Sequence, residues 1–171
     1  MIGLGKLGSA GVPRHVAPVL RDGVVVAVLR ASNWKEAAFA VVADREWIFA
    51  KRKGELTARW AADPEGTVRF RARQTSFWRS TWAVDLAGTA LRVESASAWR
   101  GTHRFLVDGQ EVAMSGSAGG WGQRPTLAVH AEAAVLPLEG QVFLLWMELL
   151  LRRRAASGAT AGTVAATGAI G

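Results

Sequence analysis

The sequence predicts a mainly β domain, mostly antiparallel, that closes around or against a single very apolar helix near the C-terminus. Two observations predict this fold class. From residue 23 to about residue 130, short runs rich in Val, Phe and Trp alternate with turn residues at intervals of roughly ten residues, which is typical of a β-meander. Residues 142–151, VFLLWMELLL, are then apolar at nine of ten positions, and a helix that is apolar on all sides has to avoid water.

The length and composition indicate one domain. A chain of 171 residues, half of them apolar, is long enough for one sizeable core. The chain has no cysteine, which excludes disulfides, thiolate catalysis and thiolate zinc sites and fits a reducing compartment, so we expect a cytoplasmic protein. Residues 1–22 begin with MIGLGKLGSAGVPRH, which is rich in glycine and lacks the apolar stretch of a secretory signal. We expect a flexible N-terminal arm there.

Turn residues divide the region between residues 23 and 130 into strands. Asp108-Gly109 joins THRFLV to QEVAMS and has the composition of a two-residue hairpin turn. Asp22-Gly23 precedes another β-like run, and the DPEG segment at 63–66 separates ELTARWA from TVRFRAR. Apolar and polar residues alternate within these last two runs, which predicts half-buried strands with one face toward the core.

The chain has eight tryptophans, and we expect most of them in the core because a large ring fills a barrel interior well. The tryptophans in regular segments are Trp34, Trp47, Trp60, Trp78, Trp82, Trp99 and Trp146. Trp121 lies in a glycine-rich segment, where an exposed anchor and a lid over one end of the domain are equally compatible with the sequence.

The apolar C-terminal segment favours a buried helix over a membrane-spanning one. Residues 141–154 would extend about 21 Å as a helix, which is shorter than the roughly 30 Å hydrocarbon core of a bilayer. The PLEG segment at 137–140 interrupts any longer apolar span, and membrane insertion stays the alternative. Arg152–Arg154 follow directly and suit the negative end of a helix dipole at a terminus that emerges into water. Residues 155–171 contain almost no large side chain, which predicts a disordered or weakly helical tail.

The order of these elements resembles the tubby C-terminal-like superfamily, which includes phospholipid scramblases and plant LURP-one-related proteins, and especially its small bacterial members. The resemblance covers roughly residues 23–154 and depends on the arrangement of four segments. They are DREWIFAKRKGEL at 44–56, TSFWRSTWAVDLAG at 75–88, THRFLVDGQEVAMS at 102–115 and VFLLWMELLLRRR at 142–154. The resemblance implies a closed antiparallel β-barrel over residues 23–154, with its C-terminal hydrophobic α-helix buried in the interior.

The resemblance also implies a link to anionic lipids, since tubby-like domains are associated with phosphoinositide binding and scramblases with lipid movement. Two departures put scramblase activity in doubt. The chain has no cysteine cluster for palmitoylation, and it has no acidic Asp-x-Asp-x-Asp loop that would bind calcium.

Basic residues supply the candidate binding site. The net charge is +7, with 21 Lys and Arg against 14 Asp and Glu, so the protein is attracted to polyanions. Alternate strand positions put three guanidinium groups on one face at ~6.5 Å intervals, where they could grip phosphates, and three basic residues before Gly54 could add charge from a neighbouring turn. The candidate anionic-ligand-binding residues are Lys51, Arg52, Lys53, Arg69, Arg71 and Arg73. The alternative is a solvated strand face whose repulsion is eased by acidic neighbours.

These features predict a non-enzymatic binding module that docks on anionic lipid headgroups or phosphoinositides through a basic strand face, at the inner surface of the membrane. An acidic protein is the other partner class, and an enzyme whose pocket is built from residues distant in sequence is the alternative function. We expect no catalytic residues, cofactor or metal, because no catalytic motif is recognisable and His15, His103 and His130 are too dispersed for a metal site. Nucleic acid is less favoured, because no helix-turn-helix, RNP-like strand or KH loop is recognisable.

Overall fold

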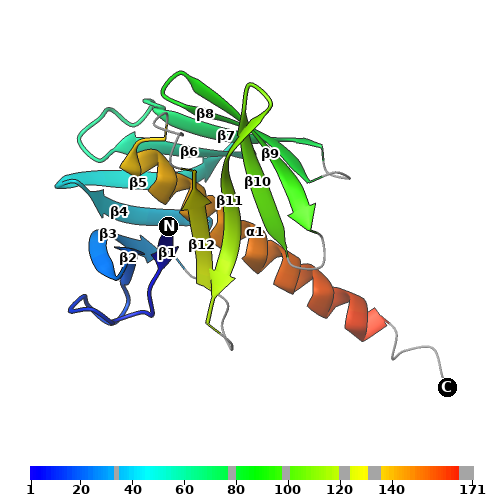
Figure 1. Cartoon of the computed structure of the whole chain (residues 1–171), viewed down its shortest axis with the longest axis horizontal. Coiled ribbons are helices and arrows are strands. Elements are labelled where there is room, and N and C mark those ends of the chain that lie inside the picture. The colour runs from blue at the N-terminus through cyan, green and yellow to red at the C-terminus, as the bar shows by residue number, and fades with distance from the viewer. Residues whose placement is uncertain (33–34, 77–79, 98–100, 120–123, 131–135, 166–171) are drawn as a thin grey trace.

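The computed structural model of the chain describes residues 1–32, 35–76, 80–97, 101–119, 124–130 and 136–165, and for residues 158–165 it describes only the backbone. Within this part, twelve antiparallel strands form one closed barrel (Figure 1). The strands are β1 (Ile2–Leu4), β2 (Ala17–Arg21), β3 (Val24–Ala31), β4 (Ala37–Val42), β5 (Arg45–Arg52), β6 (Glu55–Trp60), β7 (Phe70–Ser76), β8 (Thr81–Leu86), β9 (Thr89–Ser97), β10 (Thr102–Val107), β11 (Gln110–Ala118) and β12 (Arg124–Val129). Each strand pairs with the next along the chain, and β1 closes the barrel by pairing with both β2 and β12.

The hairpins follow the turn composition of the sequence. Asp108 and Gly109 have φ values of 50° and 81°, and Asp22 and Gly23 have values of 51° and 84°. Two successive positive φ angles are the geometry of a type I′ turn, whose twist matches that of the flanking strands. The predictions of turns at these two positions are therefore confirmed.

Residues 1–22 form the strands β1 and β2, which corrects the prediction of a flexible N-terminal arm. Ile2 pairs with Leu127 on one side and with Arg21 on the other. The glycines of this segment permit close packing: a Cβ atom at Gly5 would lie 2.7 Å from Pro18 Cγ, closer than real Cβ atoms come to a neighbour. The glycines here allow the strands that close the barrel to pack closely. Local composition alone does not distinguish this role from chain flexibility.

The helix α1 (Leu138–Ala165) passes through the barrel and is buried in its interior (Figure 1). The six side chains of residues 142–147 are each 0 % exposed, which confirms the predicted buried helix. The helix enters at one end, where Leu86 Cδ1 lies 2.9 Å from the position that a Cβ of Gly140 would take. We call this end the base. The opposite end, the exit rim, carries the connections that follow β1, β3, β5, β7, β9 and β11.

Aromatic rings fill the space between α1 and the strands on the base side. The Phe49 ring centroid lies 5.5 Å from that of Phe143 and 5.3 Å from that of Trp146. Phe70 is 5.8 Å from Phe143, and Trp47 stacks on Phe70 at 4.9 Å. Such ring pairs add to the energy of burial, so this half of the barrel is a packed core.

The expectation of tryptophans in the core is confirmed where the structure describes them. Trp47, Trp82 and Trp146 are buried, and Trp60 is half-buried. The remaining tryptophans lie outside the described residues: Trp34, Trp78, Trp99 and Trp121.

The helix continues past Arg154 to Ala165, so Arg152–Arg154 lie within α1 and the prediction that they cap its C-terminus is wrong. Residues 155–157 are exposed, and Figure 1 shows the last turns of α1 projecting beyond the strands. The buried turns already nucleate the helix, so each further residue extends it by adding one hydrogen bond. The many alanines in this segment favour that extension. The predicted tail is therefore helical as far as Ala165.

Candidate functional site

Arg152–Arg154 fix α1 to two parts of the exit rim, the strand β11 and the connection between β3 and β4. Arg152 Nη2 donates to Gly116 O at 2.8 Å, and Arg153 Nη1 donates to Ser32 O at 2.8 Å. Arg154 Nε donates to Glu36 Oε1 at 2.5 Å. Successive residues of a helix point about 100° apart, so Arg152 reaches β11 while Arg153 and Arg154 reach the β3–β4 connection, and together they hold the helix in place where it leaves the barrel.

Glu36 is the acidic centre of this anchoring. In addition to the bond from Arg154, its Oε2 lies 2.7 Å from Lys51 Nζ. The hydrogen bond from Arg154, and after it the bond from Lys51, lower the pKa of Glu36 from 4.5 to about 2 despite partial burial. Lys51, one of the predicted ligand-binding residues, therefore holds a structural carboxylate.

A cavity of about 970 Å³ opens at the exit rim, and it is lined by α1, by the connection after β1 and by residues on both faces of the strands β3 to β5. We call it the rim cavity. Its apolar lining includes Leu4, Ala17, Leu29, Ala31, Ala38, Phe49 and Leu149. The volume is at the upper end of the roughly 300–1,000 Å³ typical of small-molecule sites, so the cavity is large enough to be a candidate binding site.

The charged residues of the rim cavity are all basic. Lys6, Arg30, Arg124 and Arg153 line it together with His15, and no described Asp or Glu does. The Nε atom of Arg124 is buried without a hydrogen-bond partner among the described residues. Lys6 and His15 are exposed and come from the connection after β1, which two backbone bonds, Gly5 N to Pro18 O at 2.7 Å and Gly8 N to Val16 O at 2.9 Å, tie to the barrel.

Lys51, Arg52 and Lys53 come together in sequence at the end of β5, but their charges are used differently. Arg52 Nη1 donates to Glu65 O at 2.5 Å, and Lys51 is bound to Glu36 as described above. Lys53 is exposed in the turn after β5 and forms no hydrogen bond or ion pair with a described residue. None of the three lines the rim cavity.

Arg69, Arg71 and Arg73 do not form the continuous row that alternation predicts. Arg69 precedes β7 and turns to Asp63, with Nε 2.6 Å from Oδ2 and Nη2 2.9 Å from Oδ1. This bidentate bond lowers the pKa of Asp63 and raises that of Arg69. Arg71 Nε lies 3.3 Å from Glu55 Oε2, and Arg73 alone is exposed without a described partner.

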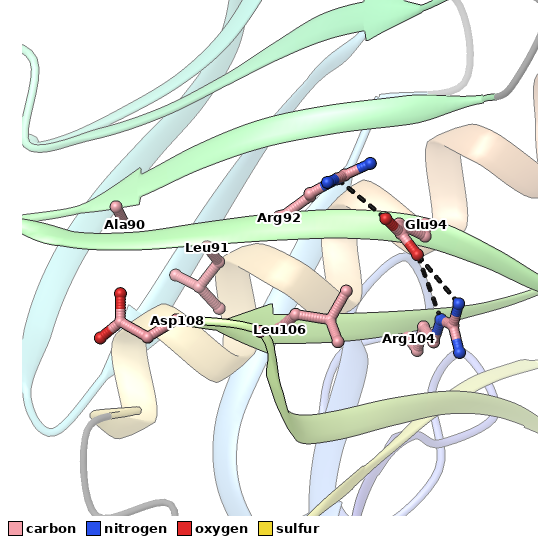
Figure 2. A pocket seen from close by; sticks show the side chains of 8 residues that line it. Ala90, Leu91, Arg92, Glu94, Arg104, Leu106 and Asp108 are labelled. Carbon is pink, nitrogen blue, oxygen red and sulfur yellow. Dashed lines mark hydrogen bonds and ion pairs between the residues drawn. The ribbon is translucent and has the colours of Figure 1, made fainter.

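A second hollow, of about 570 Å³, lies on the outer face of β9 and β10. Figure 2 shows its two arginines directed at one carboxylate. Arg92 Nε is 2.8 Å from Glu94 Oε1, and Arg104 Nη2 is 3.0 Å from Glu94 Oε2. With Asp108 also in the lining, this hollow has balanced charges, unlike the rim cavity.

A histidine and a carboxylate meet inside the barrel, on another side of α1. Glu148, which is 0 % exposed, lies with Oε1 2.9 Å from Nδ1 of His103. The backbone N–H of His103 donates to Ser115 Oγ at 2.7 Å. A single carboxylate within an apolar helix requires a polar partner, so the sequence could have predicted a buried contact at Glu148. It could not have identified His103 as the partner. Neither residue lines the rim cavity.

In comparisons with known protein families, curated proteins and solved structures, no match to this chain was found. The described residues contain no helix with the length and apolarity needed to cross a bilayer. They also bring together no group of three or more potential metal ligands among His, Cys, Asp and Glu.

Proposed function

We propose that this protein is a binding module that attaches to anionic lipid headgroups at the cytoplasmic face of a membrane, with the exit rim as its docking surface. One observation carries the proposal: the charged residues that line the rim cavity are basic, and no described acidic residue balances them there. The resemblance to the tubby-like superfamily points to the same class of ligand. The proposal moves the docking surface from the strand face to the rim, because Arg69 and Arg71 are bound to carboxylates.

Exposed apolar surface beside these charges also supports docking on a lipid surface. Leu7 is 60 % exposed and lies next to Lys6 at the mouth of the cavity. Basic residues near an anionic bilayer contribute about 1 kcal/mol each, and an apolar side chain beside them can enter the interface between headgroups and chains. The protein would therefore bind peripherally, by its rim.

Co-sedimentation of the full chain with vesicles tests the proposal. We expect binding to vesicles that contain phosphatidylglycerol, weaker binding as salt increases, and none to pure phosphatidylcholine. The double variant Lys6→Gln/Arg124→Gln should lose affinity about 30-fold, from two charges at about 1 kcal/mol each. The matched control Arg92→Gln/Arg104→Gln removes the same charge from the outer hollow and should change affinity by less than about threefold.

Three results would contradict the proposal. Equal loss in both double variants would mean that net charge alone draws the protein to the vesicle. Loss only in Arg71→Gln/Arg73→Gln would return the docking surface to the strand face. Binding of polyglutamate with the same affinity, and the same dependence on Lys6 and Arg124, would indicate an acidic protein as the partner.

A further inference from the structure

The rim cavity exists because small side chains occupy the positions where three neighbouring strands reach the exit rim. Ala17 of β2, Ala31 of β3 and Ala38 of β4 line it, and Ala17 and Ala38 are buried. Phe49 also lines the cavity and contacts Trp146 of α1, which marks the start of the filled core. Alanines stand at these positions in place of the large rings found at the base. They thus leave an apolar space between the strands and the helix.

The side of α1 that faces this space changes from apolar to cationic toward the exit rim. Residues 142–147 are fully buried, whereas Leu149 is half-buried and lines the cavity. Arg153 follows one turn later on the same side of α1 and also lines it. Within one helical turn, the lining changes from an apolar side chain to a cationic one that lies toward the mouth.

The mouth itself is cationic on more than one side. Lys6 comes from the connection after β1, Arg124 from β12 and Arg153 from α1. The buried Nε of Arg124 has no hydrogen-bond partner among the described residues, and a buried polar group without a partner is costly. Cationic groups from three separate elements therefore surround the mouth.

We propose that the rim cavity takes up a single acyl chain of an anionic lipid, with the headgroup held at the mouth by Lys6, Arg124 and Arg153. This inference rests on the proposed function and extends it from docking on a surface to holding one chain inside the protein. An open apolar cavity favours an apolar occupant. The charge of the mouth selects an anionic end over a neutral or cationic one.

Isothermal titration calorimetry with alkyl phosphates tests chain uptake without a membrane. The probes are inorganic phosphate and octyl, decyl and dodecyl phosphate, each at concentrations at which it is monomeric. We expect affinity to rise about fourfold per added methylene, as the burial of methylenes predicts, until the cavity is full. Dodecyl maltoside, which has the same chain but no charge, should bind at least about tenfold more weakly than dodecyl phosphate.

Two variants that fill the cavity separate chain uptake from docking. Ala38→Phe fills it from β4, and Leu149→Trp fills it from α1. Each should reduce the affinity for dodecyl phosphate at least about tenfold, the equivalent of about two buried methylenes, and leave binding to phosphatidylglycerol vesicles within about threefold. Ala128→Phe makes the same change at an exposed position of β12 and should alter neither. Should Ala38→Phe fail to fold, Leu149→Trp and the chain-length series still decide the question.

The outcomes distinguish the two proposals. If the wild-type protein binds phosphatidylglycerol vesicles but binds dodecyl phosphate no better than inorganic phosphate, the acyl-chain site is wrong and docking stands. If dodecyl phosphate binds and vesicles do not, docking is wrong and the acyl-chain site stands. Full affinity for dodecyl phosphate in both cavity-filling variants would also overturn the acyl-chain site.

Discussion

The two ends of the barrel enclose the same helix but treat it differently. Toward the base, Phe143 and Trp146 of α1 meet the rings of Phe49 and Phe70, and residues 142–147 are fully buried. Toward the exit rim, alanines replace the rings, a cavity opens beside Leu149, and arginines hold the helix by hydrogen bonds to the rim. Stability is concentrated in the first region, and space for a ligand in the second.

This difference shows how one barrel can combine a packed core with a binding site. At the base, the rings around α1 fill the interior of the barrel, and the hollow near this end lies on the outer face of β9 and β10. At the exit rim less apolar surface is buried, and hydrogen bonds hold the helix to the strands. Each of these bonds contributes less to the free energy of unfolding than the burial of an aromatic ring. Substitutions at the base and at the exit rim should therefore differ in their effects on stability.

Trp146→Ala should have the largest effect. The side chain of Trp146 is fully buried, at 0 % solvent exposure. Truncation of such a ring costs about 3–5 kcal/mol of unfolding free energy. Denaturation in guanidinium chloride measures the loss, with Leu7→Ala at the exit rim as the control. A loss below about 1 kcal/mol would show that the base is not the packed half.

His103→Leu should cost about 3 kcal/mol, because it leaves the buried Glu148 carboxylate without its partner at 2.9 Å. The double variant His103→Leu/Glu148→Leu should recover much of this loss, since two apolar residues of similar size can replace a buried polar pair. A double-mutant cycle by urea denaturation measures the coupling. Additive losses would mean that the two side chains do not interact.

Alanine to phenylalanine changes compare the free space at the two ends directly. Ala58→Phe, in the packed half where Ala58 is 1 % exposed, should cost roughly 3 kcal/mol through overpacking. Ala38→Phe, which enters the rim cavity, should cost about 1 kcal/mol or less. The difference in unfolding free energy between the two variants is the measurement, and equal losses would contradict the presence of usable space at the rim.

Gly5→Ala should destabilise the protein by about 1.5 kcal/mol, because a Cβ there would lie 2.7 Å from the rigid ring of Pro18. The matched control is Gly66→Ala, whose Cβ would meet no atom within 4 Å, and it should leave the stability nearly unchanged. Thermal denaturation of both variants measures the contrast. Equal melting temperatures would restore the interpretation of residues 1–22 as a loosely attached arm.

Glu36→Gln should have the smallest effect and a defined pH dependence. The pKa of Glu36 is lowered from 4.5 to about 2 by Arg154 and Lys51, so its contribution is present above pH 4.5 and is lost as the pH falls toward 2. Because the side chain is 27 % exposed, screening limits this contribution to about 1 kcal/mol. Urea denaturation at pH 6, 4 and 2.5 should show the difference from wild type shrinking, and a difference independent of pH would contradict the assignment.

Much of the fold follows from local patterns. The hairpin at Asp108-Gly109 and the buried helix over residues 142–151 are confirmed, because a positive-φ turn and an all-round apolar helix are properties of adjacent residues. The strands β1 and β2 were missed. With three residues, β1 carries too little alternation to be recognised, and its partner β12 lies more than a hundred residues away in sequence.

The candidate site was less predictable. A count of basic residues drew attention to Arg69, Arg71 and Lys51, but the structure provides each with a nearby carboxylate. The rim cavity depends instead on alanines and on Lys6 and Arg124, which carry no pattern of their own. Charge in a sequence shows how many basic groups are present, and only folding decides which of them are paired.

By itself, the sequence determined a β domain without cysteine that buries an apolar helix, because the periodicity of side chains and the conformations of turns are set between neighbours in the chain. The tertiary structure alone decided that residues 1–22 close the barrel, that Glu148 meets His103, and that a basic, apolar cavity opens at the exit rim. These features join strands and helix residues far apart in sequence, and their energies depend on distances that exist only after the barrel has closed.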